Sequence, residues 1–145
     1  MTFLLDVNAL IALIDPAHVC HDAAHRWFAE GGREAWATCP LTENGVIRIA
    51  GHPRYPGAPG SPAAVAAIVA QLRALSGHTF WPDDISLVGD EHIDAEQILA
   101  SGQVTDTYLL ALAVAHGGQL ATFDRRLSTK AVKGGKAALY LIASR

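Results

Sequence analysis

The segment FLLDVNALIALI, residues 3–14, decides the fold because a short apolar run in it leads directly into an aspartate. Phe3 to Leu5 is long enough for a buried strand, and Asn8 to Ile14 is predicted to be a short helix. Asp15-Pro16 ends that helix, because proline cannot continue one. Asp6 therefore stands at the carboxyl end of a predicted strand.

A second segment of the same kind lies late in the chain. Gln119 to Phe123 is a predicted strand that leads into Asp124. In an open parallel sheet, reactive groups gather at the carboxyl ends of the strands. If both runs belong to one such sheet, Asp6 and Asp124 point into the same crevice.

Two further acids are predicted to join them from helices. Asp106 lies in the first turn of the predicted helix Thr105 to His116, and Glu43 lies in the predicted helix Leu41 to Ala50. Closely packed carboxylates repel one another and take up protons unless a cation sits between them. A set of oxygen ligands suits Mg²⁺ or Mn²⁺ and does not suit zinc or copper.

Each acid also has a structural interpretation. Asp6 is a good helix N-cap, and Asp106 is an acid favoured by the helix dipole in a first turn. Glu43 fits a solvated helix surface, and Asp124 fits a turn before Arg125-Arg126. The metal interpretation rests on all four acids taken together.

The remaining segments alternate between helix and strand, which predicts an α/β sandwich with a mainly parallel sheet. The predicted helices are His21 to Glu30, Ala63 to Leu75 and Asp94 to Ser101, and the predicted strands are Glu34 to Thr38, Thr79 to Trp81, Leu87-Val88 and Ala138 to Ile142. Gly51 to Pro62 is rich in proline and glycine and is predicted to be a loop, and Lys130 to Lys136 a mobile basic loop.

Length and composition indicate one globular domain over residues 1–145, with 50% apolar and 17% charged residues. No apolar stretch reaches the roughly 18 residues of a membrane helix, and no basic region precedes the first apolar run. Cys20 and Cys39 do not form a CxxC pair. We therefore expect reduced thiols and a cytoplasmic location, without membrane association.

The net charge of −3 argues against a general basic nucleic-acid binder. Positive residues are nevertheless concentrated late in the chain, with two more in the middle. They form either a basic rim beside the acidic pocket, which would suit a phosphate backbone, or an ordinary solvated surface. They are Arg48, Arg54, Arg125, Arg126, Lys130, Lys133 and Lys136.

His21 and His25 share a helix face, but Asp22 follows His21 where a zinc protease site needs glutamate. We therefore expect packing and capping roles for the two histidines.

Four motifs in the same order resemble the PIN-domain family, and within it the VapC-type toxins of bacterial toxin–antitoxin pairs. They are L-L-D-x-N-x-L-I-A-L from Leu4, T-E-N-G-x-x-R from Thr42, T-D-x-x-L-L-A-L-A from Thr105 and A-T-F-D-R-R-L from Ala121. The resemblance covers essentially the whole chain. It implies a three-layer α/β/α sandwich, Mg²⁺- or Mn²⁺-dependent cleavage of RNA, a homodimer, and neutralisation by a small VapB-type antitoxin in a heterotetramer or larger complex.

The resemblance also implies roles for individual residues. Asp6 and Asp106 would bind metal directly, Glu43 directly or through water, and Asp124 as a ligand or as an acid just outside the ligand set. Thr122 matches the small hydroxyl residue before the last acid, and Asn8 a polar residue near the first. Transfer RNA is favoured over ribosomal RNA as substrate.

Two alternatives come from other classes of protein. A phosphoacceptor signalling domain needs paired acids after its first strand, whereas Val7 follows Asp6, and it needs a lysine after its last strand. A catalytically silent PIN-like interaction module is the alternative that stays open, although the complete set of acids argues against it.

Overall fold

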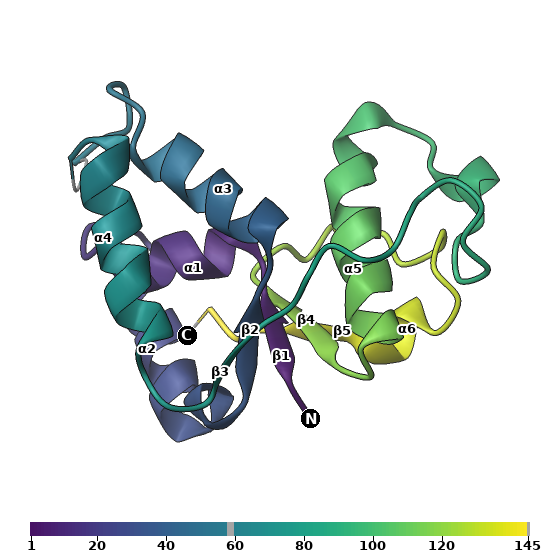
Figure 1. Ribbon diagram of the computed structural model, residues 1–145, viewed down its shortest axis with the longest axis horizontal. Helices are drawn as coiled ribbons and strands as arrows, with labels where there is room; N and C mark the ends of the chain where they lie inside the picture. Colours follow the sequence, from purple (N-terminus) through teal and green to yellow (C-terminus); the bar gives the residue numbers. More distant parts are fainter. Residues whose placement is uncertain (58–59, 145) are drawn as a thin grey trace.

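The central sheet has five parallel strands in the computed structural model, which describes residues 1–57 and 60–144 (Figure 1). Positions 58–59 of the predicted loop Gly51 to Pro62 therefore lie outside the described residues. The strands are β1 (Phe3–Leu5), β2 (Trp36–Thr38), β3 (His78–Phe80), β4 (Gln119–Thr122) and β5 (Leu139–Leu141). Their order across the sheet is β3-β2-β1-β4-β5, and each neighbouring pair is parallel.

Helices cover both faces of this sheet. They are α1 (Val7–Ile14), α2 (His21–Glu30), α3 (Pro40–Ala50), α4 (Pro62–Arg73), α5 (Val104–Ala115) and α6 (Gly135–Ala138). Figure 1 shows α1 to α4 on one side of the sheet and α5 and α6 on the other. The prediction of a three-layer α/β/α sandwich with a parallel sheet is confirmed.

The alternation of side chains along the strands creates a separate core on each face. Leu5 and Trp36 pack with α1 to α4, whereas Leu4, Ala37 and Leu120 pack with α5. Leu4, Leu5 and Trp36 are fully buried, which explains why β1 and β2 read as apolar runs without a polar face. Each such side chain stabilises the fold by roughly 1.5–3 kcal/mol.

Two predicted elements are wrong. Asp94 to Ser101 contains only the 3-10 turn Ala95–Gln97, and a second turn, Ser101–Gln103, follows. Leu99 in this segment is 76% exposed, so a helix here would have no core to cover, and a helix this short is unstable alone. Leu87-Val88 lies in a turn instead of a strand, where the Ser86 hydroxyl bonds to the Val88 backbone.

The predicted basic loop Lys130 to Lys136 consists of turns up to Gly134, but it also contains a bridge residue and the start of α6. Ala131 and Val132 are buried, and Val132 forms an antiparallel bridge with Ile93. Gly135 is buried at the start of α6. Only the lysine side chains of this segment are exposed, and they gave it the appearance of a solvated loop.

His21, His25 and the three tryptophans have packing roles. Trp36 and Trp81 are buried, and Trp27 packs edge-on against Phe3. His21 contacts the Ala12 carbonyl through Nδ1 at 2.7 Å, and His25 contacts the Leu13 carbonyl through Nε2 at 2.8 Å. These imidazoles therefore cap carbonyls in the last turn of α1, as expected.

The helices are short compared with the thickness of a bilayer. The longest in the described part of the chain, α4 and α5, have 12 residues each. Among the described residues, no helix is long and apolar enough to cross a membrane.

Candidate active site

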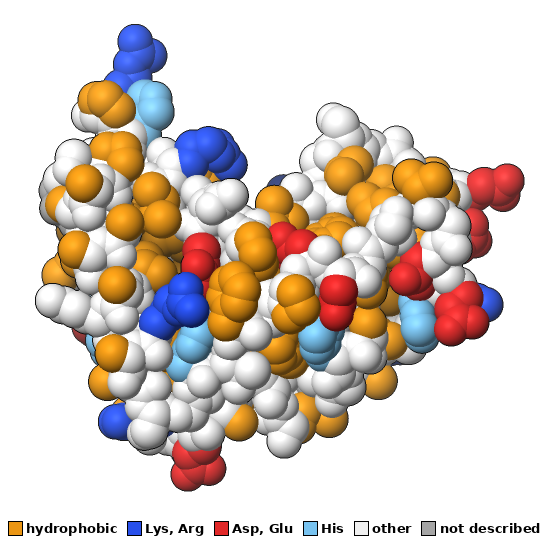
Figure 2. All heavy atoms as spheres, in the orientation of Figure 1, with side chains coloured by type: hydrophobic (Ala, Val, Ile, Leu, Met, Phe, Trp, Pro, Cys, Tyr) orange, Lys and Arg blue, Asp and Glu red, His pale blue; other side chains and the backbone are white. Residues whose placement is uncertain are grey.

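Three of the four predicted acids come together at the carboxyl edge of the sheet. Asp6 follows β1 and Asp124 follows β4, which are neighbouring parallel strands. Asp106 reaches the same edge from the first turn of α5. Figure 2 shows acidic side chains at the bottom of a notch between the two helical layers.

Asp6 is held by contacts to both of its carboxylate oxygens. Oδ1 accepts a hydrogen bond from the Val7 backbone at 2.8 Å, so Asp6 is the N-cap of α1. Oδ2 accepts from the Thr122 hydroxyl at 2.7 Å and lies 3.4 Å from the Asn8 amide nitrogen. Capping fixes the carboxylate at the strand end and is compatible with a role in metal binding.

Thr122 and Asn8 connect β1 to β4 across the site. The Asn8 amide donates to Thr122 Oγ1 at 3.0 Å, and Asn8 Oδ1 accepts from the Phe123 backbone at 3.2 Å. The Asp124 backbone N–H donates to the same Thr122 oxygen at 3.1 Å. The resemblance implied that Thr122 and Asn8 lie near the acids, and these contacts show how they orient Asp6 and Asp124.

Burial and neighbouring carboxylates raise the pKa values of Asp6 and Asp106. Burial raises the pKa of Asp6, and the charge of Asp124 raises it further, against the lowering effect of the Thr122 and Val7 hydrogen bonds. Burial raises the pKa of Asp106 to about 6, with added contributions from Asp6 and Asp124. A cation among the three carboxylates would relieve this repulsion.

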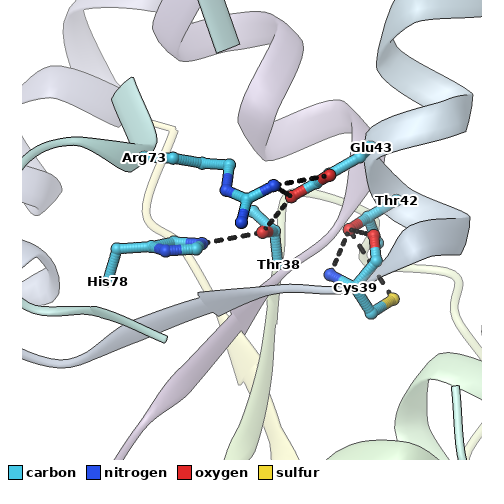
Figure 3. A network of polar contacts seen from close by, with 6 residues as sticks. All are labelled: Thr38, Cys39, Thr42, Glu43, Arg73 and His78. Atoms are coloured by element: carbon cyan, nitrogen blue, oxygen red, sulfur yellow. Dashed lines mark hydrogen bonds and ion pairs between the residues drawn. The ribbon is translucent and has the colours of Figure 1, made fainter. Parts of the chain in front are cut away.

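Glu43 is engaged in a separate network (Figure 3). Its Oε2 lies 3.1 Å from an Arg73 guanidinium nitrogen and accepts from the Thr38 hydroxyl at 2.6 Å. Its side chain is 15% exposed. Its charge is therefore balanced by Arg73 of α4. Among the described residues, none of the three aspartates forms such an ion pair.

The sequence did not reveal three members of this network: Thr38, Arg73 and His78. His78 Nε2 lies 2.7 Å from Thr38 Oγ1, and the Arg73 guanidinium lies 4.8 Å from the centre of the Phe80 ring. Burial and the charge of Arg73 lower the pKa of His78, and Glu43 opposes them. One signal was present in the sequence: Thr38 ends the predicted strand Glu34 to Thr38, and His78 directly precedes the predicted strand Thr79 to Trp81.

The donors at the sheet edge suit a hard divalent cation, because they are oxygens carrying mutually repelling charges. Within residues 1–57 and 60–144, no three His, Cys, Asp or Glu side chains converge closely enough to enclose an ion. Mg²⁺ usually keeps several waters and uses one or two carboxylates. The aspartates therefore fit Mg²⁺ held partly by water better than they fit an ion enclosed by protein ligands.

In this parallel sheet, Asp6 and Asp124 thus follow adjacent strands, and Asp106 lies on α5, which packs against one face of the sheet. Residues 3–133 match the PIN domain family, and the chain belongs to this family.

Its similarity to individual members extends over nearly the whole chain. It is 45% identical to Ribonuclease VapC39 of Mycobacterium tuberculosis over 134 residues, which is 92% of this chain and 96% of that protein. It is 42% identical to Ribonuclease VapC44 over 92% of this chain and 94% of that protein, and 44% identical to Ribonuclease VapC38 over 96% of each. The predicted membership of the VapC-type PIN domains is confirmed.

Proposed function

We propose that this protein is a Mg²⁺-dependent endoribonuclease and the toxin of a toxin–antitoxin pair. One observation carries the proposal: Asp6 and Asp124, which follow neighbouring strands, lie close enough to Asp106 of α5 for their charges to add to the effect of burial, which raises the pKa of Asp106 to about 6. The similarity to proteins named VapC ribonucleases supports RNA as the substrate.

In this proposal Asp6 and Asp106 hold the ion, and Glu43 and Asp124 bind it directly or through water. A bound Mg²⁺ or Mn²⁺ ion would supply hydroxide from its water and neutralise charge on the attacked phosphate. Thr122 keeps Asp6 in place through its hydroxyl, and Asn8 keeps Thr122 in place. Arg73 balances the charge of Glu43 until the ion is bound.

The proposed partner is a small VapB-type antitoxin. An arginine from that protein suits the acidic notch, because its planar fork pairs with carboxylates in a bidentate manner.

We further propose that the toxin is a homodimer. Light scattering at micromolar concentration would test this, and a single monomeric species would contradict it. Transfer RNA is our preferred substrate class over ribosomal RNA.

The test is cleavage of a total small-RNA pool by the purified chain. We expect cleavage with Mg²⁺, none with EDTA, and none by Asp6→Asn or Asp106→Asn. Asp22→Asn is a matched control, because Asp22 is an exposed acid in the first turn of α2. Urea unfolding of each variant separates lost chemistry from lost structure.

The alternative function is a catalytically silent PIN-like interaction module. It would be favoured if the wild-type chain bound RNA or a protein partner but left the RNA pool intact with Mg²⁺ and with Mn²⁺. Retention of full cleavage by Asp6→Asn or Asp106→Asn would instead show that the site is wrongly assigned.

A further inference from the structure

A pocket of about 340 Å³ lies at the far end of α3, away from the aspartates. It is lined by Arg48, Ile49, His52, Arg54, Tyr55 and Pro56. Pockets for small organic ligands run from roughly 300 to 1,000 Å³, so this one suits a single nucleotide and not a double helix. None of its lining residues belongs to the site described above.

The pocket carries positive charge that no acid neutralises. Arg48 and Arg54 are exposed, and within the described ranges neither forms an ion pair with a carboxylate. Guanidinium groups pair with phosphate oxygens in a bidentate manner, and they also stack on flat aromatic groups. The pocket therefore offers a phosphate two unused guanidinium groups.

The turn that follows α3 is fixed by its own hydrogen bonds. The Arg54 backbone N–H donates to His52 Nδ1 at 3.0 Å, and the Tyr55 backbone N–H donates to the His52 carbonyl at 3.0 Å. Because Nδ1 accepts a hydrogen bond, the neutral His52 ring carries its proton on Nε2. That N–H is a third donor at the rim of the pocket.

Tyr55 is an aromatic wall held from behind. Its hydroxyl donates to Asp15 Oδ2, and Asp15 Oδ1 accepts from the Ala17 backbone at 2.9 Å. The ring packs partly against the core under α1 to α4. Asp15 is 3% exposed, so it anchors the ring from inside the protein. A ring fixed in this way loses little freedom when a base stacks on it.

The pocket is connected to the candidate active site by one rigid helix. α3 begins two residues after β2, at the edge of the sheet that carries the aspartates, and its 11 residues extend about 16 Å at 1.5 Å per residue. Figure 2 shows Lys or Arg side chains above the acidic notch on the side of α3. A strand of RNA with a phosphate in the notch would reach the pocket within a few nucleotides.

We propose that this pocket binds one unpaired nucleotide of the RNA, close to the point of cleavage. Its phosphate would pair with Arg48 and Arg54, and its base would stack on Tyr55. An unpaired base is required, because stacking on a side chain needs a base released from its helix. The inference rests on the proposed ribonuclease function and assigns one nucleotide of that RNA to the pocket at the end of α3.

The test measures binding by fluorescence anisotropy, with Asp6→Asn as the background so that the RNA is not cut. The probes are a short fluorescein-labelled single-stranded RNA of mixed sequence and a duplex of the same length. The pocket variant is Arg48→Gln/Arg54→Gln, whose side chains are exposed. The control is Arg26→Gln/Arg33→Gln, which removes the same charge from exposed positions on α2 and before β2.

We expect the single strand to bind more tightly than the duplex. The pocket variant should bind the single strand about tenfold more weakly and reduce the slope of log K against log salt by about 0.7, for the one phosphate that Arg48 and Arg54 contact. The control should change neither quantity. In a parallel titration with uridine and adenosine monophosphates, the NMR signals of Ile49 and Tyr55 should shift.

The possible failures are distinguishable. If RNA is bound and cut but the pocket variant behaves like the control, the pocket inference is overturned and the proposed function stands. If RNA is neither bound nor cut but the nucleotides still shift Ile49 and Tyr55, the proposed function falls, and the pocket is a nucleotide site without the role in RNA binding inferred for it. If neither RNA nor nucleotide binds, both are overturned.

Discussion

At the scale of single residues, the acidic edge of the sheet is a place where the metal-free fold is under electrostatic stress. Asp106 is half-buried and faces the charges of Asp6 and Asp124. Asp6 is relieved by hydrogen bonds from Thr122 and Val7. Among the described residues, Asp106 has no hydrogen-bond donor of its own, so no hydrogen bond offsets the effects of burial and neighbouring charge on its ionised form.

Replacing Asp106 by Asn should therefore stabilise the metal-free protein at neutral pH. The pKa of Asp106 is raised from 3.8 to about 6, so the group favours folding below its unfolded pKa. That contribution is lost as the pH rises through about 6. Because the carboxylate is partly exposed and screened, we expect a gain of about 1 kcal/mol at pH 7.5 that disappears near pH 4.

Urea unfolding in EDTA across this pH range measures the difference between Asp106→Asn and wild type. The exposed Asp22→Asn variant is the control and should show no such pH-dependent gain. Equal stability of Asp106→Asn and wild type at pH 7.5 would mean that the ionised Asp106 carboxylate does not lower the free energy of unfolding.

The second prediction at this scale concerns the ion pair between Glu43 and Arg73. Removing either partner should be destabilising, because Glu43 is mostly buried and would be left with only the Thr38 hydroxyl. A double-mutant cycle of Glu43→Gln and Arg73→Met should give a coupling of about 1 kcal/mol. Methionine keeps an apolar stem beside Phe80.

A cycle between Arg73→Met and Glu96→Gln provides the baseline. Glu96 is an exposed acid in the 3-10 turn Ala95–Gln97, and its coupling to Arg73 should be close to zero. A Glu43–Arg73 coupling no larger than this baseline would show that the ion pair contributes nothing to the fold in solution.

At the scale of elements, the sequence predicted well those segments whose local pattern agrees with their burial. β1 and β4 are apolar runs ending at an acid, and both are strands whose ends carry the candidate site. Asp94 to Ser101 has helical spacing, but it is exposed and its backbone bonds elsewhere, for example from Asp94 to the Ala131 carbonyl. Packing decided its structure, and packing between distant segments cannot be read from spacing.

The same limit applied to the candidate site. Asp6, Asp106 and Asp124 could be placed because each sits at the end or beginning of a recognisable element. The partner of Glu43 could not, because Arg73 is 30 residues away and looks like an ordinary basic residue in the last turn of a helix. A contact of this kind depends on how α3 and α4 pack together.

The junction between α3 and α4 gives a prediction about elements. Gly51 ends α3, and a Cβ atom there would lie 2.5 Å from the Ile47 carbonyl oxygen and 2.7 Å from Pro62 Cα. These are backbone atoms that cannot move aside easily. Gly51→Ala should therefore cost about 1–3 kcal/mol of unfolding free energy.

Gly102→Ala is the matched control for this substitution. Nothing lies within 4 Å of a Cβ atom at Gly102, so the same change should stay within about 0.5 kcal/mol of wild type. Thermal unfolding of both variants compares them directly. If Gly51→Ala is as stable as Gly102→Ala, then the close contact between Gly51 and Pro62 does not hold α3 and α4 together. The turn that lines the pocket after α3 would then be less rigid than its hydrogen bonds indicate.

At the scale of the whole molecule, the three aspartates come from two layers, and the fourth predicted acid, Glu43, lies in the third. Asp6 and Asp124 come from the sheet, Asp106 from the α5 layer, and Glu43 from the α1–α4 layer. A separate hydrophobic core packs each helical layer against the sheet. A partner that bound one helical layer and reached into the notch would contact the acids without having to unfold either core.

The whole-molecule prediction is therefore about growth of cells that express the chain without a partner. Wild type should arrest growth because it cuts RNA, and co-expression of its cognate small protein should restore growth by closing the notch. Asp6→Asn should allow growth, since it removes one carboxylate but keeps an N-cap for α1.

Asp22→Asn is the control. It removes the same charge from the surface of α2 and should arrest growth like wild type. Growth curves with matched expression levels provide the measurement. Equal arrest by wild type and Asp6→Asn would place the toxicity outside the acidic site and would remove the nuclease-toxin proposal while leaving the fold untouched.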